Sequence, residues 1–188
     1  MLLKRLAVLS MPLYFAGAAL AGASVGSQGA EETADLGRAF SSLHAVAQAA
    51  INISDMAEKN AKSQLVKDYA KQVSSGNAAL DTRLMEIASQ LSIEITPLDA
   101  QTDAGKSLVV RLEAEKELLS SLDGDAWDKE YMTLVTNTQQ SVLKFSTSRI
   151  ATATNERVRT FFTNLKALVE GRLTIAQEIL EKVYGNDL

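Results

Sequence analysis

Apolar and small residues recur at intervals of three and four along most of the chain, as they do on one face of an α-helix. The first such stripe predicts a helix from Leu36 to Ala61. A second stripe predicts a helix that Ser63 caps and that ends near Pro97, because the residue before a proline avoids helical geometry. It consists of Val66, Tyr69, Val73, Gly76, Leu80, Leu84, Ile87 and Leu91. The short link between these helices predicts antiparallel neighbours.

The same spacing continues in the second half of the chain. Residues 108–122 predict a shorter amphipathic helix, and Asp125 predicts the cap of a long helix through Arg149. The last helix opens around Thr154 and Asn155. No strand pattern competes, so we predict an all-α, antiparallel up-down four-helix bundle in which residues 108–122 form an extra short helix or a broken half of the third.

The composition agrees with this fold class. Two prolines, ten glycines and 5% aromatic residues among 188 leave a chain rich in residues that lose little on entering a helix. There is no cysteine, which excludes disulfides, thiol chemistry, cysteine-bound zinc and iron–sulfur clusters.

The N-terminus has the three parts of a secretory signal: basic Lys4 and Arg5, an apolar run from Leu6 to Leu20, and an A-x-A cleavage site at Ala21 and Ala23. We expect cleavage after Ala23 and a periplasmic product. The alternative is an uncleaved anchor, because residues 6–23 carry no charge and are nearly long enough to span a bilayer. The proline at position 12 and the polar residues 24–29 favour cleavage.

Cleavage defines three parts: a signal peptide (1–23), a flexible linker (24–34) and a helical bundle domain (35–185). The mature chain loses two of 19 basic residues and none of 23 acidic ones, which leaves 17 against 23 and a net charge of −6. This sign argues against nucleic acid and anionic lipid as partners. We therefore expect no membrane association after cleavage.

His44 is the one histidine of the chain and the first candidate for a metal ligand or general base. No carboxylate or second histidine lies three or four positions away, so we interpret it as a residue at the edge of the core. Glu113 and Glu117 form a helical pair within a charged run with Glu115, which is typical of a solvated face. No nucleophile elbow or phosphate-binding glycine loop is present. We predict no catalytic residue, no cofactor and no enzymatic activity.

Three short stretches, residues 65–70 (LVKDYA), 127–132 (WDKEYM) and 173–178 (LTIAQE), resemble a family of exported bacterial proteins grouped as Domain of Unknown Function 4142. The resemblance covers most of the mature chain and implies a ferritin-like bundle. It also implies a metal site, because such proteins place a glutamate in the first helix, aspartate–histidine pairs in the second and third, and a histidine in the fourth.

The corresponding positions in this chain lack every expected histidine. They fall near Ala50, on Gly76 and Asn77, within residues 137–139, and on Arg172. We therefore predict no metal site, and we take Asn77, Gln139 and Arg172 as candidates to line a polar interior. The alternative is that Ala50 and Gly76 let helices approach closely while the polar groups face solvent.

Two functions follow. The first is a non-enzymatic periplasmic bundle that acts through its surface on another envelope protein, in envelope or stress tolerance. The alternative is a residual metal-binding or small-ligand carrier of ferritin-like type. No motif identifies the partner or an oligomeric state.

Overall fold

The computed structural model describes residues 28–97 and 103–185, so the expected signal peptide, including Ala21 and Ala23, lies outside the described residues. The described part contains five helices and no strand, which confirms the all-α class. The helices are α1 (Gln28–Asn60), α2 (Gln64–Gln90), α3 (Asp103–Ser120), α4 (Gly124–Thr152) and α5 (Glu156–Tyr184). Residues 108–120 thus belong to a separate helix, and α4 is continuous.

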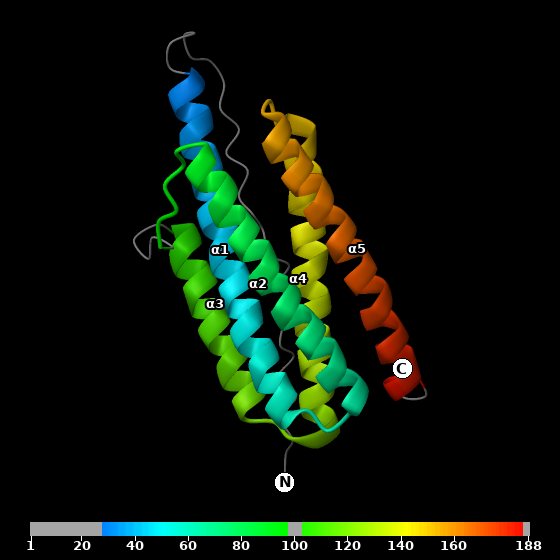
Figure 1. Ribbon diagram of the computed structural model, residues 1–188. Coiled ribbons are helices and arrows are strands. Elements are labelled where there is room, and N and C mark those ends of the chain that lie inside the picture. Colours follow the sequence, from blue (N-terminus) through cyan, green and yellow to red (C-terminus); the bar gives the residue numbers. More distant parts are fainter. Residues whose placement is uncertain (1–27, 98–102, 186–188) are drawn as a thin grey trace.

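Successive helices alternate in direction, and they form two antiparallel hairpins, α1–α2 and α4–α5 (Figure 1). The hairpins face each other, with α2 in contact with α5 and α1 in contact with α4. The helix α3 packs outside this arrangement against α4. None of the described helices is long and apolar enough to cross a membrane.

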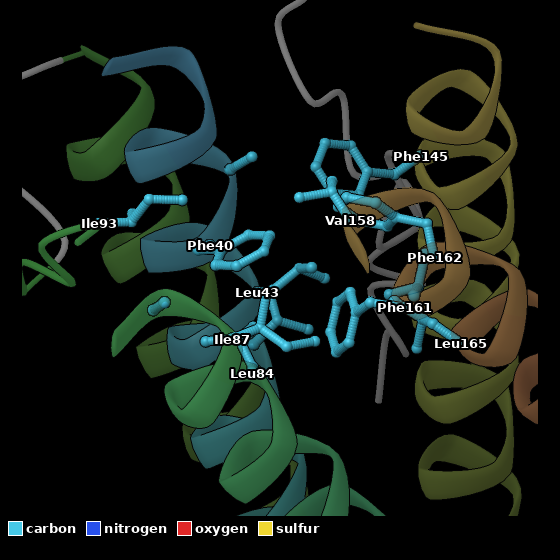
Figure 2. Packing of buried hydrophobic residues seen from close by; sticks show 14 of the residues in the cluster. Phe40, Leu43, Leu84, Ile87, Ile93, Phe145, Val158, Phe161, Phe162 and Leu165 are labelled. Atoms are coloured by element: carbon cyan, nitrogen blue, oxygen red, sulfur yellow. The ribbon is translucent and has the colours of Figure 1, made fainter. Parts of the chain in front are cut away.

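Two apolar clusters hold the hairpins together. The upper cluster lies toward the α4–α5 connection and is rich in phenylalanine; Figure 2 shows Phe40, Leu43, Leu84, Ile87, Phe161 and Phe162 meeting between the helices. The ring centroids of Phe161 and Phe162 are 5.3 Å apart in an edge-to-face arrangement. The lower cluster lies toward the α1–α2 connection and contains Tyr69, Leu119, Trp127, Tyr131 and Met132. Packing on this scale supplies the main stabilisation of a chain that lacks disulfides.

The helix starts differ from the predictions in three places. Helix α3 begins at Asp103, five residues before the predicted start at Leu108. Helix α1 begins at Gln28, inside the predicted linker, because most of the residues before Leu36 are the good helix formers Ala, Glu and Gln and the acidic Glu31 lies in the first turn. Helix α4 begins at Gly124, so its N-cap is Asp123, and the expected cap Asp125 lies in the first turn. Asp125 instead pairs with Lys62 at 2.7 Å.

The start of α2 is capped from another helix. Ser63 occupies the N-cap position, but its side chain makes no capping hydrogen bond. The fully buried carboxylate of Asp128, on α4, accepts hydrogen bonds from the backbone N–H groups of Lys62 (2.9 Å) and Ser63 (2.7 Å). Asp128 thereby ties the turn of the α1–α2 hairpin to the start of α4.

Candidate functional site

A polar layer separates the two apolar clusters at the middle of the bundle. On each of the four long helices, a residue of the upper cluster and a residue of the lower cluster lie two to three turns apart. These pairs are Val46 and Ile53 on α1, Leu84 and Val73 on α2, Val142 and Val135 on α4, and Val169 and Ala176 on α5. Between these pairs lie Ala50, Asn77, Gln139 and Arg172 respectively. The positions picked out by the family resemblance therefore occur at one level of the structure.

The polar members of this layer are buried. The exposed fractions of Asn77, Gln139 and Arg172 are 8%, 6% and 7%, so these groups do not face solvent. Gly76 serves a different purpose from the one expected, because a Cβ at this position would lie 1.9 Å from Nη2 of Arg172. The missing side chain of Gly76 thus makes room for a guanidinium. We call Asn77, Gln139 and Arg172 the polar layer.

A cavity of about 60 Å³ lies at the polar layer. All four long helices and α3 line it, mostly with apolar side chains. The lining includes Leu43, Val46, Ala47, Ala50, Ile53, Val73, Asn77, Leu80, Arg111, Leu112, Glu115, Leu134, Val135, Gln139, Val142, Leu165, Val169 and Arg172. A water molecule needs roughly 10–15 Å³ on this measure, so the cavity has room for about four to six water-sized groups.

A short chain of hydrogen bonds fixes the orientation of Gln139. The Tyr69 hydroxyl donates to the backbone carbonyl of Arg172 at 3.2 Å, and Gln139 Nε2 donates to the same hydroxyl oxygen at 2.7 Å. The amide of Asn77 is occupied locally, because its Nδ2 donates to the carbonyl of Val73 at 2.8 Å. The remaining oxygen of Gln139, Oε1, is buried and has no hydrogen-bond partner within the described part of the chain. An unsatisfied buried acceptor is costly, so this atom marks a place where a donor is missing.

Arg172 carries the only charge of the polar layer. None of the ion pairs formed between described residues includes it, and its one hydrogen bond there is a long contact of 3.5 Å from Nη2 to the carbonyl of Gln72. Burial lowers the pKa of Arg172, and it raises the pKa values of Tyr69 and Tyr131, so neither phenol supplies a negative charge at neutral pH. Arg172 therefore stays protonated without a neutralising neighbour.

The residues of this layer do not fit a metal ion. Two neutral amides and a guanidinium offer no anionic oxygen and no imidazole nitrogen, which are the groups that hold iron, manganese or zinc in proteins. No group of three or more histidine, cysteine, aspartate or glutamate residues that could hold a metal ion occurs among the residues described. The described residues at these positions therefore do not match the metal site that the family resemblance implies.

The sequence missed a second polar cluster, on the α1–α2 interface. His44 Nδ1 lies 2.7 Å from one carboxylate oxygen of Asp81, and Gln48 Nε2 donates to the other at 2.7 Å. The carboxylate was not foreseen because it comes from α2 and not from the neighbouring turns of α1. None of these three residues lines the cavity. Through these two contacts the cluster ties α1 to α2.

The charged run on α3 is also only partly a solvated face. Glu113 and Glu117 are exposed, as expected, but Glu115 is half-buried and lines the cavity beside Arg111, with Oε1 3.6 Å from Arg111 Nε. Burial raises the pKa of Glu115, and the neighbouring Arg111 opposes this shift. Arg111 thus has the carboxylate partner that Arg172 lacks.

The comparisons with known proteins give one match. The model of a domain of unknown function, DUF4142, matches residues 23–179, which include four of the described helices completely and most of α5. No curated protein and no solved structure matches the chain. The family model covers most of the sequence, and the chain belongs to the DUF4142 family.

Proposed function

We propose that this protein is an exported, non-enzymatic binding protein that holds a small ligand in the cavity at its polar layer. The observation that carries the proposal is that Gln139 and Arg172 both line that cavity, while among the described residues Gln139 Oε1 has no donor and Arg172 has no anionic partner. Proteins seldom bury such groups without a partner. A ligand that supplies both would remove both costs.

The surroundings favour binding over catalysis. The lining is mainly aliphatic, and the histidine that would be the natural general base, His44, is engaged with Asp81 outside the cavity. A cavity with an apolar wall and a few oriented polar groups is typical of a small-molecule binding site. The basic, apolar and A-x-A segments of the first 23 residues support export, and the location we propose is the periplasm.

The test uses protein that is expressed from the full chain and purified, with backbone amides followed by NMR. The probes are glycolamide, ethanolamine and glycolate, which share a two-carbon frame but differ in charge. We expect at least one to shift the amide signals of cavity-lining residues at millimolar concentration. The variant Ala50→Leu, which fills the cavity, should abolish the shifts, whereas Ala151→Leu, at an exposed position of α4, should leave them unchanged. If none of the probes shifts these amides, the proposed function is wrong.

A separate structural feature supports the other predicted function, in which the protein acts through its surface on another envelope protein. A groove of about 420 Å³ runs between α2 and α5, where Leu80, Phe161 and Leu168 lie beside the charged Arg83 and Arg157. Leu168 is 38% exposed there. An envelope protein that docks in this groove should cross-link in intact cells to a photoreactive residue at position 168, and not to one at the exposed position 177. Equal cross-linking at both positions would argue against a docking groove.

A further inference from the structure

The polar layer presents two unmet requirements that differ in kind. Arg172 needs a negative charge, because burying a charge without compensation is strongly unfavourable. Gln139 Oε1 needs a hydrogen-bond donor, and its orientation is fixed because Nε2 of the same amide is held by the Tyr69 hydroxyl at 2.7 Å. Water meets the second requirement only, and a halide meets the first only. A single molecule with both an anionic group and a donor meets both.

The geometry of the Arg172 guanidinium indicates which kind of anionic group it would bind. Arginine presents its donors in a planar fork that matches the two oxygens of a carboxylate. In the described structure one of these donors has a protein acceptor, the carbonyl of Gln72, at 3.5 Å. Gly76 keeps the guanidinium in the layer, since any larger residue would displace Nη2. The fork is thus held in place with most of its hydrogen-bonding capacity unused.

The size of the cavity limits the rest of the molecule. With about 60 Å³, it has room for roughly five non-hydrogen atoms, which favours a ligand smaller than a sugar or a nucleotide. Its aliphatic wall suits the carbon atoms of such a ligand. Resting on the proposed function, we infer that the polar layer binds a small hydroxy- or amino-carboxylate, with the carboxylate on Arg172 and the hydroxyl or amino group donating to Gln139 Oε1.

Calorimetric titration with three matched probes tests this assignment. Glycolate carries both groups, acetate lacks the donor, and glycolamide lacks the charge. A ligand of five heavy atoms reaches at best about micromolar affinity, so we expect a Kd for glycolate between about 1 µM and 1 mM. Acetate should bind several-fold more weakly and glycolamide about tenfold more weakly or worse, because hydrogen bonds to charged groups are the stronger ones.

Single-residue variants test which side chains contact the ligand. Arg172→Met should weaken glycolate binding about tenfold or more. Arg38→Met, which removes an exposed arginine that lies outside the cavity and is paired with Asp35, should change it by less than about twofold. Gln139→Leu should lower the affinity for glycolate to that for acetate and leave acetate binding unchanged. A general loss of structure would weaken both probes equally.

The outcomes separate the inference from the proposed function. If glycolamide binds as tightly as glycolate in the cavity, the ligand is neutral, so the carboxylate inference is wrong and the binding function stands. If chloride binds as tightly as glycolate, the layer is a simple halide site and the inference is again wrong. If no probe binds, both are wrong. Loss of glycolate binding in Arg111→Met with retention in Arg172→Met would place the anion on α3 and overturn the assignment to Arg172.

Discussion

The contact between Gly76 and Arg172 gives a sharp stability prediction. Replacing a helical glycine by alanine normally stabilises a protein by about 0.5–1 kcal/mol, because the unfolded chain loses conformational freedom. Gly171, which is exposed on α5 and has open space where a Cβ would lie, should show this gain. At Gly76 the new methyl group would lie 1.9 Å from Nη2 and 3.1 Å from Cζ of Arg172, so the guanidinium must move.

The displaced guanidinium loses its place in the layer and its contact with Gln72, which we expect to cost about 1–2 kcal/mol. Gly76→Ala should therefore be neutral or destabilising by about 1 kcal/mol. In an Arg172→Met background the cost should disappear, because a methionine ends near the position of Nε, which is 3.7 Å from the new Cβ. Gly76→Ala should then stabilise as much as Gly171→Ala, which gives a coupling of about 1–2 kcal/mol between positions 76 and 172.

Urea unfolding followed by circular dichroism measures all four members of this cycle, with m-values as the check on two-state behaviour. Arg172→Met alone should cost little or even stabilise the protein, since replacing a buried unpaired charge by an apolar group of similar volume is often favourable. If Gly76→Ala stabilises the wild-type protein as much as Gly171→Ala does, the guanidinium does not lie against α2. The arrangement described for the polar layer would then be wrong.

Four further predictions concern other parts of the chain. Asp128→Ala should destabilise the protein by about 2–4 kcal/mol in the same urea assay, since it removes a fully buried carboxylate and leaves the two N–H groups at the start of α2 without their acceptor. Ser63→Ala should change stability by less than about 0.5 kcal/mol. The hydrogen bond from Arg149 holds the pKa of Asp35 below its ordinary value of 3.8. The stabilisation that this ion pair gives the folded state is therefore present above pH 3.8 and is lost as the pH falls through the lower folded-state pKa. Asp35→Asn should lower the melting temperature at pH 7 and match wild type under strongly acidic conditions. Iron, manganese or zinc at tens of micromolar should leave the melting temperature unchanged, because a ligand selective for the native state must raise it by mass action; a rise of several degrees would show a metal site. Cell fractionation with N-terminal sequencing should find the protein in the periplasm beginning at or near Ser24, and full-length chain only in the membrane fraction would contradict cleavage.

Local features of the fold were predictable from the sequence. Asn155 is one example: it caps α5 through hydrogen bonds from the backbone N–H groups of Arg157 and Val158, two and three residues away. Contacts between distant residues were not predictable in the same way. The carboxylate that caps α2 comes from Asp128, 65 residues further along, and the partner of His44 comes from Asp81 on the next helix. A stripe of apolar positions predicts which face of a helix is buried, but it does not predict which polar group of another helix will contact that face.

The polar layer also shows what a stripe of apolar positions cannot predict. Gly76 and Leu80 were placed on the inward stripe of α2, whereas Asn77 and Asp81, one position further, are the more deeply buried residues. A helix turns by about 100° per residue, so a stripe drawn through apolar residues alone passes beside polar ones that face the same interior. Likewise, α1 begins eight residues before the first apolar position at Leu36, because propensity and not patterning forms its first turns.

A crystal structure of the protein grown in the presence of glycolate would show at once whether the polar layer is a carboxylate site. We expect density for one glycolate in the cavity, with its carboxylate in the plane of the Arg172 guanidinium and its hydroxyl within hydrogen-bond distance of Gln139 Oε1. A cavity that holds only water, with Arg172 turned away from it, would refute the assignment.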